Sequence, residues 1–327
     1  MGKKIGITST VPVEILLAAD YQAIDLNNIF INSRNPSSYI EKAERDGFPK
    51  TYCSWIKGIY SASVKNSINE VVAVLEGDCS NTHALMEVLK LRKAYVIPFA
   101  FPFSRDEKDL KFQLERFMER MGTNIRKVSK IRNELVPLRK KLKEIDYLTY
   151  STCQVTGEEN HTYLISSSDF KGDAGNFEKE LDDFLYLAKK REKKKIKTRL
   201  GFIGVPPIFT DLYSFISRRG AEVVFNETQR QFSMPCFESD MTTQYLSYTY
   251  PYDVFGRIED IKKAIRERKL NGIIHYVQSF CYRQLADLIF RRKLKIPLLT
   301  LEGEQPGLLD ARTKVRIEAF LEMLNEK

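Results

Sequence analysis

The sequence lacks any apolar run near the roughly 18 residues that a membrane span needs, which argues against a membrane protein. It also lacks the apolar stretch of a secretory signal, because Met1-Gly2-Lys3-Lys4 leads at once into a strand pattern. Gly6 stands where a myristoylation motif requires Ser or Thr, so a lipid anchor is not indicated. The 5 cysteines are few, odd in number and widely spread, which makes a poor disulfide framework. We therefore expect a cytoplasmic protein with free thiols.

Charge of one sign is only modestly in excess. Lys and Arg outnumber Asp and Glu by 52 − 43 = 9 among 327 residues, which favours acidic or phosphorylated partners without selecting nucleic acid. Two regions are strongly basic, namely 189–199 and the group Arg139, Lys140, Lys141 and Lys143. Because they contain few aromatic side chains for base stacking, we interpret them as solvated helix faces and expect no nucleic acid partner.

The first half of the chain alternates β-branched runs with helical patterns, which is typical of an α/β sheet. We expect strands at 5–8 and 71–75 and a helix at 12–19. Apolar residues then recur every three or four positions over 106–145, which predicts a helical segment that Pro137 kinks or breaks. A further amphipathic helix at 177–188 runs into the basic residues 189–197, where we place a domain boundary.

The alternation restarts after this boundary. We expect strands at 200–205, 221–225, 272–277 and 296–301, with helices at 209–218, 258–268, 282–292 and from 309 onward. The sequence therefore predicts two Rossmann-like (flavodoxin-like) domains with parallel sheets. The N-terminal α/β domain spans 1–197 and carries a helical insertion at 105–195, and the C-terminal α/β domain spans 198–327.

Three of the cysteines share one local setting. Cys79 follows the predicted strand 71–75 and the turn Glu76-Gly77-Asp78, and it precedes an amphipathic helix. Cys281 repeats this arrangement after the strand 272–277, and Cys53 also opens an apolar-periodic segment, although its preceding strand is less clear. A helix N-terminus lowers the pKa of a thiol and favours the thiolate that binds metal.

Because the carboxyl ends of strands in open α/β sheets are where ligands bind, the three junctions can converge on one crevice. Three thiolates there would hold an iron–sulfur cluster with one iron left open. A free cysteine is also often a small buried hydrophobe, and the close C-x-x-C spacing of a specific motif is absent. We interpret Cys153 and Cys236, which lie at no strand-to-helix junction, as structural.

Histidines offer a second metal hypothesis. His83 lies four residues after Cys79 and on the same helix face, which permits a zinc site with Cys53, Cys79 and Cys281. His275 lies within a predicted buried strand and is interpreted as a core histidine with a satisfied ring. His161 has no evident partner.

With these junctions identified, the sequence resembles the 2-hydroxyacyl-CoA dehydratase family, whose relatives include benzoyl-CoA reductase subunits and double-cubane cluster proteins. The segment 11–20 is similar to the family's opening Pro-x-Glu-Leu helix with its two alanines. Cys53, Cys79 and Cys281 fall where the family places its cluster cysteines. The segments 296–303 and 310–320 complete the resemblance, and the latter is the most family-like stretch.

The resemblance implies a [4Fe-4S] cluster held by Cys53, Cys79 and Cys281 between the two domains, with the fourth iron open to water or substrate. It implies a dehydratase or reductase subunit that pairs with a homologous or identical subunit and acts on an acyl-CoA or another small substrate. An ATP-hydrolysing activator with its own iron–sulfur cluster would supply one electron. The substrate thioester carbonyl would become a ketyl radical, which expels the 2-hydroxyl group.

Some features depart from the family pattern. The chain is shorter than expected of a dehydratase subunit, no segment is assignable to CoA binding, and too few suitably placed cysteines remain for a double-cubane cluster. Thr8, Ser9 and Thr10 follow the first strand, so Ser9 is a candidate for a catalytic hydroxyl near the open iron, although these hydroxyls equally suit helix capping. Glu14 is a candidate for proton handling. A non-catalytic cluster or electron-transfer protein on the same scaffold remains the alternative.

Overall fold

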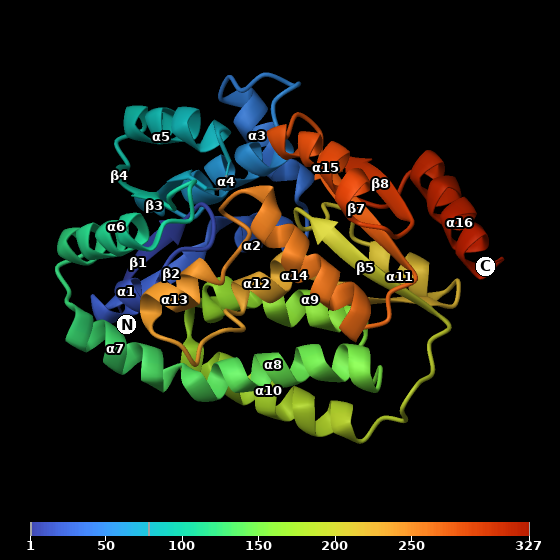
Figure 1. Ribbon diagram of the computed structural model, residues 1–327. Coiled ribbons are helices and arrows are strands. Elements are labelled where there is room, and N and C mark those ends of the chain that lie inside the picture. Colours follow the sequence, from blue (N-terminus) through green and yellow to red (C-terminus); the bar gives the residue numbers. More distant parts are fainter. Residues whose placement is uncertain (1, 78, 327) are drawn as a thin grey trace.

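Two four-stranded parallel sheets carry the fold (Figure 1). The computed structural model describes residues 2–77 and 79–326, so Met1, Lys327 and Asp78 of the predicted turn lie outside the described residues. The first sheet has the order β2-β1-β3-β4 and the second has the order β6-β5-β7-β8. The strands are β1 (Lys3–Ile7), β2 (Tyr21–Asp25), β3 (Glu70–Glu76), β4 (Tyr95–Ala100), β5 (Thr198–Gly204), β6 (Ala221–Asn226), β7 (Gly272–Gln278) and β8 (Leu298–Gly303). The predicted α/β fold with two parallel sheets is confirmed.

The apolar runs of the sequence become the central strands of these sheets. All seven residues of β7 are buried, and so are Val71 to Val74 of β3. Burial on both faces is the usual environment of strands in a parallel sheet covered by helices. In each sheet the strand order reverses between two central strands, β1 and β3 in one and β5 and β7 in the other. Loops that leave these strands diverge and open a crevice.

Five helices lie in the part of the chain that forms the first sheet. They are α1 (Val13–Ala18), α2 (Leu26–Ile31), α3 (Ser37–Arg45), α4 (Ser54–Lys65) and α5 (Asn81–Leu91). The expected strands at 5–8 and 71–75 and the helix at 12–19 are confirmed within a few residues. The short strand β2 and the helices α2 and α3 were not expected, because none of them carries a long apolar pattern.

The insertion between the sheets is helical, as expected. It consists of α6 (Glu107–Arg120), α7 (Ile125–Glu134), α8 (Val136–Ser151), α9 (Gly157–Ile165) and α10 (Ala174–Lys189), with 3-10 turns η1 (Ser166–Ser168) and η2 (Phe170–Gly172). Pro137 lies in the first turn of α8, so the expected break is confirmed. Proline is tolerated there because the N–H that it lacks would have no helical partner.

The segment after β5 adds helices of 6 to 15 residues. They are α11 (Leu212–Ser217), α12 (Glu227–Phe232), α13 (Met241–Leu246), α14 (Val254–Glu267), α15 (Ala286–Lys293) and α16 (Ala311–Asn325), with the 3-10 turn η3 (Tyr282–Leu285) ahead of α15. All four expected strands are present. The helix expected at 282–292 begins instead as η3, so Cys281 precedes a 3-10 turn.

The basic regions differ partly from expectation. Residues 191–195 are exposed in the loop between α10 and β5, and Lys140 and Lys143 are exposed on α8. Arg139 contradicts the expectation of a solvated face, because its side chain is buried with only 2% of its surface exposed. Within the described part of the chain, no helix has the length and apolar character that crossing a membrane requires.

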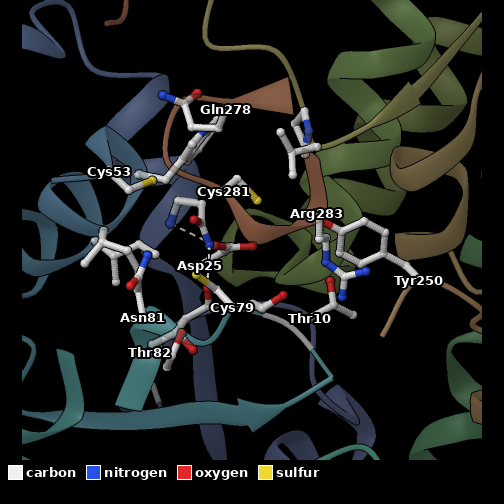
Figure 2. A pocket seen from close by; sticks show the side chains of 18 of the residues that line it. Thr10, Asp25, Cys53, Cys79, Asn81, Thr82, Tyr250, Gln278, Cys281 and Arg283 are labelled. Atoms are coloured by element: carbon white, nitrogen blue, oxygen red, sulfur yellow. Dashed lines mark hydrogen bonds between the residues drawn. The ribbon is translucent and has the colours of Figure 1, made fainter. Parts of the chain in front are cut away.

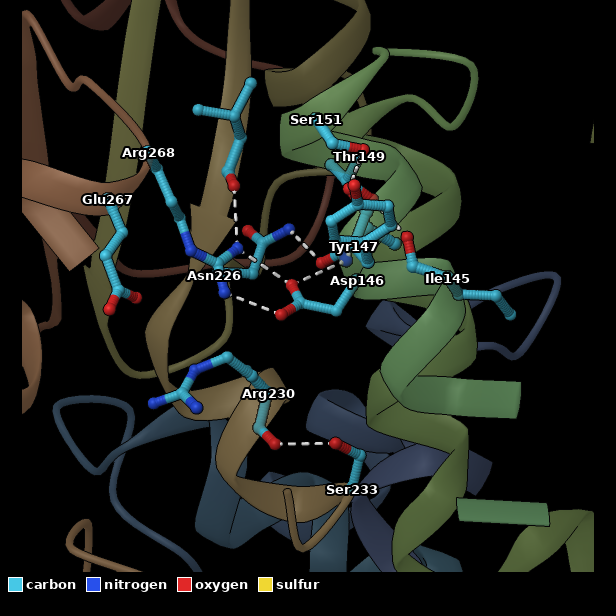
Figure 3. A network of polar contacts seen from close by, with 12 residues as sticks. Ile145, Asp146, Tyr147, Thr149, Ser151, Asn226, Arg230, Ser233, Glu267 and Arg268 are labelled. Atoms are coloured by element: carbon cyan, nitrogen blue, oxygen red, sulfur yellow. Dashed lines mark hydrogen bonds and ion pairs between the residues drawn. The ribbon is translucent and has the colours of Figure 1, made fainter. Parts of the chain in front are cut away.

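A buried ion pair joins the helical insertion to the second sheet (Figure 3). Nη1 and Nη2 of Arg268 donate to the two carboxylate oxygens of Asp146 at 2.9 and 2.6 Å. Arg268 Nη1 also donates to the Val224 carbonyl in β6, and Asn160 donates to Asp146 from α9. The Arg268 guanidinium holds the pKa of Asp146 below its usual range, against the effect of burial.

We expect Asp146→Ala to lower the free energy of unfolding by about 3–5 kcal/mol, because Arg268 then stays buried without its carboxylate. Urea unfolding monitored by circular dichroism measures this loss. Lys130→Ala is the control, because Lys130 and Glu134 form an exposed pair whose charged atoms lie 3.8 Å apart, and we expect no measurable change there. Equal small effects in both variants would contradict this account of the network.

Candidate functional site

One cleft lies between the carboxyl ends of the two sheets and encloses about 870 Å³, its open mouth included. Its walls come from the loops after β1, β3, β5 and β7, from α2 and α4, and from single residues of α9 and α12. The lining residues are Thr8, Ser9, Thr10, Asp25, Asn27, Asn28, Cys53, Trp55, Ile56, Ile59, Cys79, Asn81, Thr82, Ile165, Val205, Pro206, Phe232, Tyr250, Gln278, Cys281, Tyr282 and Arg283.

The structure brings the three singled-out cysteines together in this cleft, on different sides of one space (Figure 2). Cys79 follows β3 and Cys281 follows β7, as expected. Cys53 is the N-cap residue of α4, but it follows the turn after α3, so the strand expected before it is absent. Cys153 and Cys236 do not line the cleft.

Two glycines bring the cleft loops close to their neighbours. Gly77 has φ +93°, and a Cβ there would lie 2.7 Å from the Phe101 Cβ and 2.8 Å from the Pro251 carbonyl oxygen. Gly204 ends β5 with φ +101°, and a Cβ there would lie 2.1 Å from the Tyr276 carbonyl oxygen. Only glycine fits these positions without strain. Both therefore fix the direction in which a loop enters the cleft.

The expectation of a lowered thiol pKa is wrong for Cys53. Burial raises the pKa of this thiol, and the backbone N–H groups of Trp55 and Ile56 at the start of α4 offset only part of that effect. Only 7% of the residue is exposed, so loss of hydration outweighs the helix N-terminus. A metal at this position would itself supply the positive charge that stabilises the thiolate.

The hydroxyl groups after β1 face the cleft and do not cap α1. Pro12 is the N-cap residue of α1 and no side chain makes a capping hydrogen bond, so the capping alternative is wrong. The Thr8 hydroxyl oxygen accepts from the Val74 N–H at 3.0 Å, which ties this loop to β3. Ser9 lines the cleft with 9% of its surface exposed, and the buried Thr10 Oγ1 has no hydrogen-bond partner.

Three cleft-lining residues carry buried polar atoms without a hydrogen-bond partner. They are Thr10 Oγ1, Asn28 Oδ1 and the indole Nε1 of Trp55. An unpaired buried polar group costs about 1–3 kcal/mol, so such atoms are rare unless something binds them. Their gathering around one cleft indicates that a ligand completes the site.

Glu14 does not line the cleft, although it was a candidate for proton handling. Its carboxylate is fully buried and accepts from Arg139 Nη2 at 2.6 Å, Gln244 Nε2 at 2.8 Å and the Tyr245 hydroxyl at 2.5 Å. Although burial opposes it, these partners, led by Arg139, hold the pKa of Glu14 below its ordinary value. Because it lies outside the cleft lining, Glu14 does not enter the function proposed below.

The structure agrees with only some of the predictions for the other cysteines and the histidines. His83 is exposed and lies outside the cleft lining, so the structure does not bring it to the three cysteines. Buried His275 pairs with Asp287 at 2.8 Å, which confirms a satisfied core histidine. His161 Nδ1 accepts from the Gln229 side-chain N–H, and burial lowers the pKa of His161 to about 4. Of the two cysteines interpreted as structural, Cys153 is buried and Cys236 is exposed.

No three His, Cys, Asp or Glu side chains of the described residues lie close enough to hold a single metal ion. Thiolates are the donors that iron–sulfur clusters take, so the three cleft thiols fit such a cluster in kind. The zinc alternative needs His83 as a fourth ligand, and His83 is not among the cleft-lining residues.

Several cleft residues escaped the sequence analysis. Asp25 and Asn28 line the cleft from the junction of β2 and α2, and Trp55 lines it from α4. A polar residue that directly follows the apolar pair Ala23-Ile24 is the signal that would have marked Asp25, since it ends a strand at the ligand-binding edge. The short Tyr-Gln-Ala-Ile-Asp run was not identified as a strand, so this signal was missed.

Comparison with known families agrees with this geometry. The family model of the 2-hydroxyglutaryl-CoA dehydratase D-component matches residues 8–324, which include β3, β7 and all three cleft cysteines. No curated protein matches the chain. The match begins directly after β1 and covers the strands from β2 to β8 and the helical insertion. The chain therefore belongs to the 2-hydroxyglutaryl-CoA dehydratase D-component family.

Proposed function

We propose that the chain is a subunit of a 2-hydroxyacyl-CoA dehydratase-type enzyme and binds a [4Fe-4S] cluster through Cys53, Cys79 and Cys281. The observation that carries the proposal is the convergence of these three thiols, out of five in the chain, on one cleft between two sheets. When bound, such a cluster supplies a Lewis-acidic iron and a one-electron relay for the substrate thioester. Membership of an iron–sulfur family supports the same reading.

The neighbouring side chains suit such a group. Trp55, Ile56, Ile59 and Phe232 give the cleft an apolar part of its lining, and apolar surroundings strengthen electrostatic interactions. Thr10 Oγ1, Asn28 Oδ1 and Trp55 Nε1 supply unpartnered polar atoms in the same lining. Burial that excludes water and a few fixed polar groups are the features by which a site orients a small substrate.

The residues after β1 have a positioning role in this proposal. Ser9 presents its hydroxyl group to the cleft, while Thr8 anchors the loop to β3 through the Val74 N–H. Asn28 and Trp55 provide an amide oxygen and an indole N–H, so the wall offers an acceptor and a donor to polar atoms of a substrate. The substrate class that follows from the family is a 2-hydroxyacyl-CoA or a related small thioester.

The proposal includes partners that the family implies. These are a homologous or identical subunit and an ATP-hydrolysing activator that delivers one electron. An exposed apolar surface lies on the segment 280–288, which includes the cleft-lining residues Cys281 and Tyr282. Phe280, Tyr282, Leu285 and Leu288 expose 58%, 49%, 71% and 62% of their surface. Exposed apolar groups of this kind commonly mark a protein interface.

Anaerobic reconstitution with iron and sulfide tests the proposal. We expect about four irons and an equal amount of sulfide per chain, with an electron paramagnetic resonance signal after one-electron reduction. Addition of a small thiol or 2-hydroxyglutaryl-CoA should then change that signal if one iron is open. An unchanged signal favours the alternative of an electron-transfer protein with a fully ligated cluster. A chain that takes up one zinc ion and no iron would overturn the cluster.

A further inference from the structure

A second cavity lies behind one wall of the cleft. Lys4, Ile24, Ile68, Asn66, Asp169 and Lys171 are among its lining residues, and we call it the outer cavity. It opens to solvent, because Lys4, Asn66 and Lys171 are exposed. Asp25 and Asn28 line both the cleft and the outer cavity, so they form the partition between them.

The partition contains two buried carboxyl groups. Asp25 and Asp169 expose only 4% and 7% of their surfaces, and they come from the end of β2 and from the junction of η1 and η2. The backbone N–H of Asp25 donates to Asp169 Oδ2 at 2.7 Å. The Ser168 hydroxyl donates to Asp25 Oδ2 at 2.6 Å. Hydrogen bonds between the two segments thus hold the two carboxyl groups near each other.

The donors are divided unequally between the two carboxyl groups. Asp25 accepts from the Ser168 hydroxyl and, at 2.9 Å, from both the backbone and the side-chain N–H groups of Asn27. Asp169 accepts from two backbone N–H groups, those of Asp25 and Lys171. Three donors favour the ionised form of Asp25, so the proton of the pair belongs to Asp169.

Burial and the adjacent Asp25 charge raise the pKa of Asp169 to about 7, and burial also raises the pKa of Asp25. Two buried carboxyl groups cannot both ionise at low cost, so the pair keeps one proton near neutral pH. The charged groups around the outer cavity are Lys4 of β1 and Lys171 of η2, of which Lys171 pairs with Glu180. On the cleft side, the ionisable neighbours are the three cysteines, Tyr250, Tyr282 and Arg283.

We propose that Asp25 and Asp169 form a proton-transfer pair that connects solvent in the outer cavity with the cleft. This inference rests on the proposed function, because the atom that accepts the proton is an oxygen of the bound 2-hydroxyacyl substrate. The step moves one proton and no electrons. The proton held by Asp169 first passes to Asp25, as the O–H bond of Asp169 breaks and one forms on Asp25. The Asp25 O–H bond then breaks on the cleft side while an O–H bond forms on the substrate oxygen. Asp169 takes a new proton from water in the outer cavity and leaves hydroxide to the solvent.

Carbon-13 NMR of the chain labelled at aspartate carboxyl carbons tests the pair without any cluster. We expect one resonance to titrate near pH 7, to vanish in Asp169→Asn and to persist in Asp183→Asn, whose side chain is exposed. In Asp25→Asn the same resonance should titrate at lower pH, because the repelling charge is gone. If every aspartate carbon titrates below about pH 5, the range of ordinary carboxyl groups, the pair is refuted.

The iron-loaded chain tests the connection to the cleft. We expect the midpoint potential of the cluster to depend on pH around neutrality in the wild type and in Asp183→Asn, and to lose this dependence in Asp169→Asn. A potential that ignores pH, alongside an intact NMR titration, would overturn the connection but leave the proposed function standing. A chain that binds no iron would overturn the proposed function and the substrate step, and the NMR result would still stand.

The pair also affects folding stability in a defined direction. Because the pKa of Asp169 is raised in the folded chain, the folded state binds the proton more tightly than the unfolded state does. The free energy of unfolding therefore falls as pH rises from about 4 to about 7, and is lowest above that window. We expect the urea midpoint to drop less between pH 5 and pH 8 in Asp169→Asn than in the wild type. An identical drop in both proteins would contradict the raised pKa.

Discussion

Reconstituted iron should fall from about four atoms per chain to near zero in Cys53→Ser, Cys79→Ser and Cys281→Ser. A cluster with three protein ligands loses a corner when one thiolate is removed, and the serine oxygen is a harder and weaker ligand for iron. The three thiols approach the cleft from α4, β3 and β7, so no neighbouring cysteine is placed to substitute for the missing one. Iron and sulfide analysis with electron paramagnetic resonance measures the loss.

Cys153→Ser and Cys236→Ser are the matched controls. Neither residue lines the cleft; Cys153 is buried with its Sγ 3.5 Å from Arg199 Nη1, and Cys236 is exposed. Both variants should keep the full iron content. Circular dichroism must show native folding in all five variants, because Cys53 is itself packed in the core. Iron that is lost in Cys236→Ser, or kept in Cys79→Ser, would contradict the assignment.

His83→Ala separates a cluster from the zinc alternative. His83 is exposed on α5 and outside the cleft lining, so its removal should leave the iron content and the spectrum unchanged. If metal content falls in this variant as it does in Cys79→Ser, the four-ligand zinc site must be reconsidered. One reconstituted preparation of each variant serves for both the metal analysis and the spectrum.

The parallel sheets could be predicted from the sequence because their strands are short, continuous apolar runs. Such runs are typical of strands buried on both faces, and β3, β5 and β7 each contain one. The edge strand β2 was missed because only two of its five residues are buried. Local patterns thus predict the central strands β3 and β7, which precede Cys79 and Cys281, better than they predict the edge strand β2.

Other features of the site depend on contacts that no local pattern contains. Cys53 lines the cleft, yet its junction has no strand and its thiol is too buried for the helix N-terminus to lower its pKa. Asp25 and Asp169 are 144 residues apart in the sequence, and only folding brings them together. Arg139 was interpreted as part of a solvated basic run, but its partner Glu14 lies 125 residues away.

Arg139→Met should lower the free energy of unfolding by about 3–5 kcal/mol, because Glu14 then stays buried without its counter-charge. Arg139 on α8 and Glu14 on α1 expose 2% and 0% of their side chains, so water cannot replace the lost partner. Gln244 and Tyr245 of α13 also bind this carboxylate. The cluster therefore ties together the first domain, the helical insertion and a segment of the second half.

The double variant Glu14→Gln, Arg139→Met identifies the cause. It removes the buried charge and keeps an amide oxygen to accept from Gln244, so most of the stability should return. Urea unfolding at pH 7 measures the stability of both variants. A double variant as unstable as the single one would show that lost packing around Arg139, and not the unpaired carboxylate, causes the effect.

The pH dependence of the single variant gives a second test. In Arg139→Met alone, the pKa of Glu14 should rise, because its largest favourable partner is gone while burial remains. The free energy of unfolding of the single variant should therefore recover partly as pH falls toward 5, since protonation relieves the buried charge.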